Sequence, residues 1–119
     1  MSNNHRKTFF IDIDGTLLKH KGDFSDISTD EPKILPYVRE KMNEWCSKEY
    51  NIIIVTAGRE SVRSVTEHQL QSLGIPYDQL IMGIGKGERI IINDKRPNGD
   101  ITASAINIDR DMGFTEINI

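Results

Sequence analysis

The sequence predicts an α/β domain built around a mainly parallel, doubly wound sheet. Short apolar segments of strand length alternate with segments whose apolar residues recur at helical spacing. One segment, Ile52 to Val55, is a continuous β-branched run, which is typical of a strand buried on both faces of a parallel sheet. Polar side chains follow several of these strands at their carboxyl ends, which is where ligands bind in such sheets.

The first half of the chain contains the clearest elements. Thr8 to Ile13 is an apolar strand, which Gly15 and the polar segment Lys19 to Pro32 bring to an end. Apolar residues at helical spacing then predict one helix on each side of the run Ile52 to Val55, and Gly74 with Pro76 stops the second helix. The two stripes consist of Leu35, Val38, Met42 and Trp45, and of Val62, Thr66, Leu70 and Leu73.

Further strands are expected in the second half. Gln79 to Met82 and Arg89 to Ile92 are short apolar segments separated by a glycine-rich connection, and Ala105 to Ile108 is a candidate for a last strand. Phe114 to Ile119 has no clear pattern. The order of strands and helices is that of a doubly wound sheet.

The composition fits one globular domain spanning residues 1–119. The chain has 119 residues, of which 37% are hydrophobic, and a formal net charge of −3, which gives no overall attraction to nucleic acid or to an anionic membrane. Met1 to Lys7 is polar and lacks the apolar centre of a secretory signal. No run approaches the roughly 20 apolar residues of a membrane-spanning helix. A cytoplasmic protein without a membrane partner is therefore expected.

Two aspartates one residue apart, Asp12 and Asp14, end the first predicted strand. Residues two apart on a strand point to the same side, so the two carboxylates should converge where the chain turns at Gly15. Such a pair needs a counter-charge, which a hard cation such as Mg²⁺ supplies through oxygen ligands. One carboxylate can then act as a nucleophile while the other handles a proton. The pair indicates metal-assisted phosphoryl chemistry, with a solvated turn or a calcium loop as the alternative for this motif alone.

The string Asp12-Ile13-Asp14-Gly15-Thr16 resembles the first motif of the haloacid dehalogenase (HAD) superfamily, most of whose members are Mg²⁺-dependent phosphatases that work through an aspartyl-phosphate. Segments resembling the other three motifs follow in the same order, and the resemblance spans roughly Lys7 to Pro97. It implies a Rossmann-like (HAD-like) three-layer sandwich. The intervals between the motifs are too short for the cap domains of the superfamily, so we expect little or no cap and an open site.

Two of these segments imply contacts with a substrate phosphate. Thr56 ends the second strand, where its hydroxyl and the backbone amides from Ala57 onward can donate to phosphate oxygens, although a threonine there serves equally well as a helix N-cap. Lys86 stands among glycines in Gly-Ile-Gly-Lys-Gly. A lysine in a loop is usually only solvated, but the third motif of the superfamily is a lysine at about this place.

The apolar run that ends at Asn93 and Asp94 resembles the fourth motif of the superfamily. The sequence departs from the frequent acidic pair of the superfamily by having Asn93, which leaves open whether Asn93 or Asp94 binds the metal directly. Without the other motifs, the same residues would be read as an ordinary turn at the end of a strand.

The resemblance implies a role for each site residue. Asp12 would attack phosphorus, and Asp14 would protonate the leaving alcohol and later activate water. Mg²⁺ would be bound by Asp12, by the backbone carbonyl of Asp14, and by Asp94 or Asn93. Near the predicted mouth of the site, two arginines could contact substrate, although exposed charges are more often solvated. These arginines are Arg59 and Arg96.

The expected function is that of a Mg²⁺-dependent phosphomonoester hydrolase acting on a small phosphorylated metabolite, either a sugar phosphate or a nucleotide. The alternatives are a phosphatase of nucleic-acid ends or of phosphoproteins, and a non-catalytic phosphoryl-binding module. An open site also allows a second copy of the chain to cover it.

Overall fold

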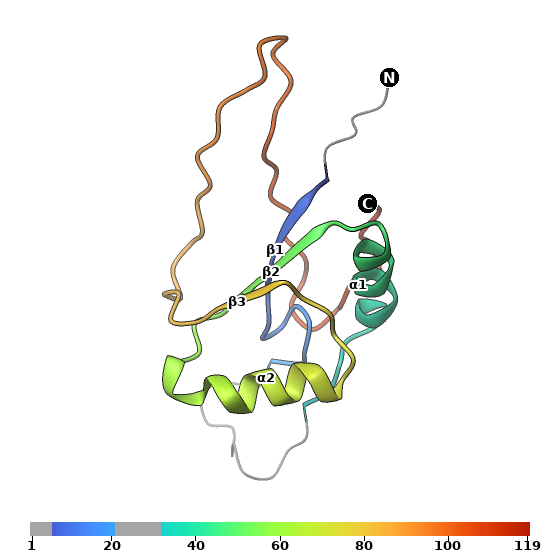
Figure 1. Ribbon diagram of the computed structural model, residues 1–119, viewed down its shortest axis with the longest axis vertical. Coiled ribbons are helices and arrows are strands. Elements are labelled where there is room, and N and C mark those ends of the chain that lie inside the picture. Colours follow the sequence, from blue (N-terminus) through green and yellow to red (C-terminus); the bar gives the residue numbers. More distant parts are fainter. Residues whose placement is uncertain (1–5, 21–31) are drawn as a thin grey trace.

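The computed structural model describes residues 6–20 and 32–119, which form one three-stranded parallel sheet and two α-helices (Figure 1). The strands are β1 (Thr8–Asp12), β2 (Asn51–Val55) and β3 (Gln79–Ile81), in the order β1-β2-β3. Most of the predicted polar segment Lys19 to Pro32 lies outside the described residues. The α/β class predicted from the sequence is confirmed.

The register of the sheet brings the three carboxyl ends to one edge. Asp12 at the end of β1 lies opposite Val55, and Val55 lies opposite Ile81 at the end of β3. Parallel neighbours need crossover connections, which explains why a helix separates each pair of strands. The loops after the three strands therefore start close together.

The two helices provide those crossovers. α1 (Val38–Ser47) joins β1 to β2, and a 3₁₀ turn (Glu60–Val62) followed by α2 (Arg63–Ser72) joins β2 to β3. The first predicted stripe is buried at all four positions, but α1 begins at Val38, so Leu35 precedes the helix. The second is confirmed in part, since Leu70 is buried but Val62 is exposed in the 3₁₀ turn. In the described part of the chain, no helix is long and apolar enough to cross a membrane.

Trp45 on α1 lies at the centre of an aromatic cluster. Its ring stacks on Phe9 of β1 with a centroid distance of 4.1 Å and contacts Phe114 at 5.6 Å. The backbone N–H of Phe114 donates to the carbonyl of Pro36 at 2.9 Å, and the Trp45 indole N–H donates to the carbonyl of Ile119 at 3.2 Å. Residues 108–119, which we call the tail, thus complete the core beside α1, although they contain no recognisable motif.

Gly113 fixes the path of the tail over α1. Its φ is +68°, and a Cβ at this position would lie 2.4 Å from the carbonyl oxygen of Pro36. Only glycine tolerates both the left-handed backbone and this approach. The next residue, Phe114, is thereby turned into the core.

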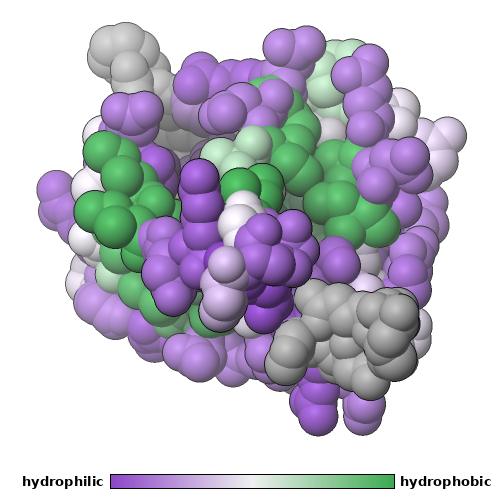
Figure 2. Space-filling view, turned by 90° about the horizontal axis from the view of Figure 1, so that it is seen from above, coloured by the Kyte–Doolittle hydropathy of each residue, from purple (hydrophilic) through white to green (hydrophobic). Residues whose placement is uncertain are grey.

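The predicted strands at Arg89 to Ile92 and Ala105 to Ile108 are wrong. Residues 85–107, which we call the arm, are all exposed and form an extended excursion that projects from the sheet (Figure 1). Ile90, Ile91 and Ile92 are 73%, 52% and 92% exposed. Seen from above, apolar side chains stand at the surface among polar ones (Figure 2).

The physical reason is that a β-branched run favours extended backbone whether or not it finds a partner strand. The arm makes local links instead. The N–H of Arg96 donates to the carbonyl of Asp100 at 2.9 Å, and the Asn93 side chain donates to the Thr102 hydroxyl at 3.2 Å. Strand pairing depends on distant residues, which local propensity does not reveal.

The doubly wound arrangement is also corrected by the structure. Such a sheet reverses its strand order at a switch point. The described strands progress from β1 to β3 without a reversal, and in this part of the chain β1 pairs with β2 alone. The described residues therefore form a smaller α/β unit than the three-layer sandwich expected from the resemblance, with one edge of β1 open.

Candidate functional site

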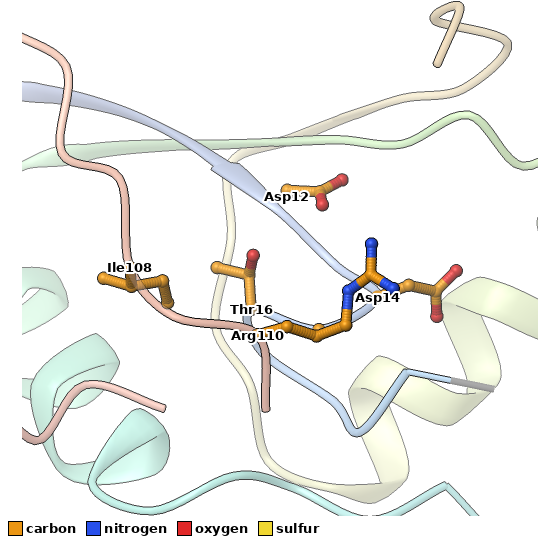
Figure 3. A pocket seen from close by; sticks show the side chains of 6 residues that line it. Asp12, Asp14, Thr16, Ile108 and Arg110 are labelled. Carbon is orange, nitrogen blue, oxygen red and sulfur yellow. The ribbon is translucent and has the colours of Figure 1, made fainter. Parts of the chain in front are cut away.

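A polar pocket of about 270 Å³ opens at the carboxyl end of β1 (Figure 3). Four of its lining residues come from the end of β1 and the following turn, and two come from the start of the tail. They are Asp12, Asp14, Gly15, Thr16, Ile108 and Arg110. The pocket thus brings together segments from the two ends of the described chain.

The turn after β1 is held by one carbonyl group. The carbonyl of Ile13 accepts hydrogen bonds from the N–H groups of Thr16, Leu17 and Leu18 at 3.1, 2.9 and 3.1 Å. Gly15 has a φ of +81°, and its N–H donates to the carbonyl of Leu18 at 2.7 Å. A positive φ at this sharp turn favours glycine.

Burial alternates along this turn. Ile11, Ile13 and Leu17 point into the core, while Asp12 and Asp14 line the pocket. The apolar side chains anchor the turn, and the period-2 alternation of extended backbone leaves both carboxylates on the pocket side. The structure therefore places the two predicted catalytic aspartates in one pocket.

Asp12 lies in a mixed electrostatic environment. Burial raises the pKa of its carboxyl group above the usual value, and the neighbouring Asp14 carboxylate acts in the same direction. A hydrogen bond with the backbone of Ile13 and the charge of Arg89 oppose this rise in pKa. The Arg89 Nη2 atom lies 3.9 Å from Asp12 Oδ1, and both side chains are 40% exposed, so this is a loose ion pair.

Arg110 is a lining residue that the sequence did not indicate. The N–H of its neighbour Asp111 donates to the carbonyl of Gly15 at 2.9 Å, and the Asp111 carboxylate accepts from the N–H of His20 at 2.7 Å. The Arg110 stem lies against Gly15, where an added Cβ would be 3.1 Å from Arg110 Cγ. No motif of the sequence contains this arginine. It reaches the turn after β1 only through the fold, so the sequence alone could not place it there.

Thr56 stands on the same edge of the sheet as the pocket without lining it. It follows Val55, the register partner of Asp12, and is 5% exposed. Its hydroxyl oxygen accepts from the N–H of Gly58 at 3.1 Å. The 3₁₀ turn that precedes α2 begins after Arg59, so the alternative role of Thr56 as a helix N-cap is wrong. Ala57, half-buried, continues the same loop.

The predicted residues on the arm lie apart from the pocket. Lys86 is exposed at the start of the arm, and Arg96 is exposed at its tip, where its backbone bonds Asp100. Asn93 bonds Thr102, whose hydroxyl donates to the carbonyl of Asp94. Arg59, at the start of the loop before α2, is also exposed.

The distance along the arm explains why Asp94 does not reach the acidic pair. Arg89 contacts Asp12, and an extended chain advances about 3.3 Å per residue, so Asp94 stands up to about 16 Å further along. Within residues 6–20 and 32–119, no group of three or more His, Cys, Asp or Glu side chains is placed to hold a metal ion. The structure brings Asp12 and Asp14 together, but not Asn93 or Asp94 with them.

Comparison with known proteins bears on the fold. No family model and no curated protein matches the chain. A structural-genomics target from Vibrio cholerae has a similar solved structure, with a TM-score of 0.52 and 19% sequence identity over 77% of this chain and 85% of that chain. The likeness is one of fold. It supports the α/β architecture described above.

Proposed function

We propose that this chain is a Mg²⁺-dependent phosphomonoester hydrolase whose nucleophile is Asp12. The observation that carries the proposal is that Asp12 and Asp14 line one polar pocket at the carboxyl end of a parallel strand. Two arginines border the same place, Arg110 in the lining and Arg89 beside Asp12. Paired carboxylates with cations nearby suit a reaction at phosphorus, where positioning and charge stabilisation dominate catalysis.

The two carboxylates have different roles in this proposal. A carboxylate oxygen of Asp12 attacks phosphorus, the bond from phosphorus to the ester oxygen breaks, and Asp14 gives its proton to the departing alcohol. Water then attacks the aspartyl-phosphate, Asp14 accepts a proton from this water, and inorganic phosphate leaves with Asp12 restored. The more exposed position of Asp14 suits a group that exchanges protons with water.

The donor set at the pocket fits Mg²⁺. This ion is commonly held by one or two carboxylates and keeps several waters, and Asp12 and Asp14 supply such a pair. When bound there it would neutralise the acidic pair and the incoming phosphate. Asn93 and Asp94 lie on the exposed arm outside the pocket lining, so the acidic pair supplies the protein ligands in this proposal.

The pocket has room for the reacting end of a phosphate ester. Its volume of about 270 Å³ suits a phosphate group and a small alcohol, such as a sugar or the ribose of a nucleotide. We therefore propose small phosphorylated metabolites as the substrate class. Because the pocket is open, a larger substrate can extend beyond it, and the choice between the two is made by the substrate panel below.

The test is release of phosphate from a panel of esters with Mg²⁺ present. We expect activity in the wild-type protein, loss with EDTA, and loss in Asp12→Asn, whereas Asp100→Asn on the exposed arm serves as the matched control and keeps activity. Equal turnover by the wild type and Asp12→Asn would refute the proposed nucleophile. Activity confined to polymer ends, or phosphate binding without turnover, would favour the other two functions considered from the sequence.

A further inference from the structure

Among residues 6–20 and 32–119, Arg110 is the one basic residue that lines the acidic pocket. Among the described residues its guanidinium lies in no ion pair, whereas Arg89 is already beside Asp12. Figure 3 shows the Arg110 side chain extending along the turn toward the acidic pair. Its positive charge lies in the same pocket as the carboxylates of Asp12 and Asp14, where an incoming anion would meet it.

The backbone around Arg110 is fixed rather than loose. Asp111 has a φ of +65°, which is uncommon outside glycine. Its N–H donates to the carbonyl of Gly15 at 2.9 Å, and its carboxylate accepts from the N–H of His20 at 2.7 Å. The stem of Arg110 fills the space that a side chain at position 15 would need. Two tethers and one close contact therefore fix the backbone at Arg110 and the start of its side chain beside the pocket.

From this placement we infer that Arg110 binds the phosphate group of the substrate. The inference deepens the proposed function and rests on it for the identity of the anion. A dianionic ester that approaches Asp12 and Asp14 is repelled by both carboxylates, and a guanidinium on the pocket wall offsets that repulsion. Its planar fork also donates two parallel hydrogen bonds to a pair of phosphate oxygens.

Lys86 is the cation that the family resemblance implied for this task. It lies outside the pocket lining, exposed at the start of the arm. Arg110 therefore takes the phosphate-binding role in the described conformation, and the matched control is Lys48, an exposed cation at the carboxyl end of α1 that no part of the site includes.

The experiment measures binding of inorganic phosphate to the full chain with Mg²⁺ present, by titration calorimetry. Arg110→Met keeps most of the stem but removes the charge, and should weaken phosphate binding by about tenfold or more. Arg110→Lys keeps the charge but lacks the planar fork, so its phosphate affinity should lie between those of the wild type and Arg110→Met. Lys48→Met, which removes an exposed cation at the carboxyl end of α1, should bind phosphate as the wild type does. Equal affinity in Arg110→Met and the wild type, or an equal loss in Lys48→Met, would overturn the inference.

A second measurement needs no variant. Phenylglyoxal modifies accessible guanidinium groups, and mass spectrometry locates the adducts. Phosphate with Mg²⁺ should protect Arg110 while leaving Arg6, exposed before the amino end of β1, as reactive as before. Absence of protection at Arg110 would count against the inference even if Arg110→Met fails to fold.

The two proposals fail in different ways. If the chain binds phosphate through Arg110 but hydrolyses no ester, the anion site is supported and the proposed enzymatic function is refuted. If the wild type hydrolyses esters and Arg110→Met does so with the same KM, the enzymatic function is supported and the proposed role of Arg110 is refuted. A purely structural role would lower Tm in Arg110→Met and Arg110→Lys alike, without the graded effect on phosphate affinity.

Discussion

Replacing Gly113 by alanine should be among the most damaging small changes in this chain. The added Cβ would lie 2.4 Å from the Pro36 carbonyl oxygen and 2.8 Å from the Pro36 nitrogen, whereas ordinary contact begins near 3.4 Å. Both neighbouring atoms belong to the backbone, so no side chain can rotate out of the way. The tail must therefore move by about 1 Å from its place beside α1.

The magnitude follows from what that movement disturbs. A left-handed φ costs alanine about 1–2 kcal/mol, and the hydrogen bond from Phe114 to Pro36 contributes about 1 kcal/mol. Phe114 also loses part of its packing on Trp45, where complete removal of a buried phenylalanine side chain costs about 3–5 kcal/mol. We expect Gly113→Ala to lower the free energy of unfolding by about 3–5 kcal/mol, a large share of the roughly 5–15 kcal/mol of a typical domain.

Gly83 offers a matched control. Its φ of +77° is close to that of Gly113, but nothing lies within 4 Å of the Cβ that alanine would add. Gly83→Ala should therefore lower the free energy of unfolding by the backbone contribution alone, about 1–2 kcal/mol. Urea unfolding followed by the fluorescence of Trp45, the single tryptophan of the chain, measures both variants. Equal destabilisation of the two variants would refute the proposed contact between the tail and Pro36.

Three further predictions concern the arm and the acidic pair. Ile92→Asn should change the free energy of unfolding by no more than about 0.5 kcal/mol, because Ile92 is 92% exposed. Ile52→Ala in β2 should lower it by about 2–5 kcal/mol. A large loss of stability for Ile92→Asn in urea unfolding would instead support the buried strand expected from the sequence. Trypsin should first cut the native chain within residues 85–107, as mapped by mass spectrometry, and earlier cleavage in α1 would contradict this. Without Mg²⁺, Asp12→Asn should raise Tm at pH 7: burial raises the pKa of Asp12 in the folded state, so the ionised carboxylate destabilises the fold as the pH rises above the unfolded pKa. The gain in Tm should shrink as the pH falls toward about 4, and a lower Tm of the variant at pH 7 would contradict the assigned cause.

The sequence allowed the elements around β1 and α1 to be predicted because their signals are local. Apolar residues at helical spacing mark the buried face of α1, and Trp45 at the end of that stripe is indeed central to the core. The run Ile52 to Val55 similarly indicated the central strand β2. Each of these patterns is read within one element, without knowledge of its neighbours.

The arm could not be predicted in the same way. A run such as Ile90 to Ile92 favours extended backbone, and sequence alone does not distinguish a strand within a sheet from an extended segment that pairs with nothing. The choice depends on contacts with distant residues. The placement of Asn93 and Asp94 was inferred from the strand that was expected to precede them. Because that strand does not form, these residues do not lie at the edge of the sheet.

Arg110 shows a further limit of reading motifs. Its place at the pocket depends on hydrogen bonds between residues far apart in the chain, such as the one from His20 to Asp111, which are separated by 91 positions. Only two turn features, Gly15 and Gly113, could have been noticed beforehand, and neither indicates what it turns toward. The acidic pair could be predicted because both of its members lie in one short segment, Asp12 at the end of β1 and Asp14 in the turn that follows.

The tail links the pocket to the core, so changes in stability and in ligand binding should be coupled there. Within a few residues it supplies Arg110 to the pocket, the tether of Asp111 to Gly15, the close approach of Gly113 to Pro36, and Phe114 to the aromatic cluster. A shift of Gly113 cannot leave Arg110 in place, because the two are three residues apart and are held at both ends. Gly113→Ala should therefore weaken phosphate binding even in the fraction of chains that stays folded, whereas Gly83→Ala should not. Calorimetric titration of both variants with phosphate and Mg²⁺ decides this, and an unchanged affinity in folded Gly113→Ala would show that the pocket and the core are independent.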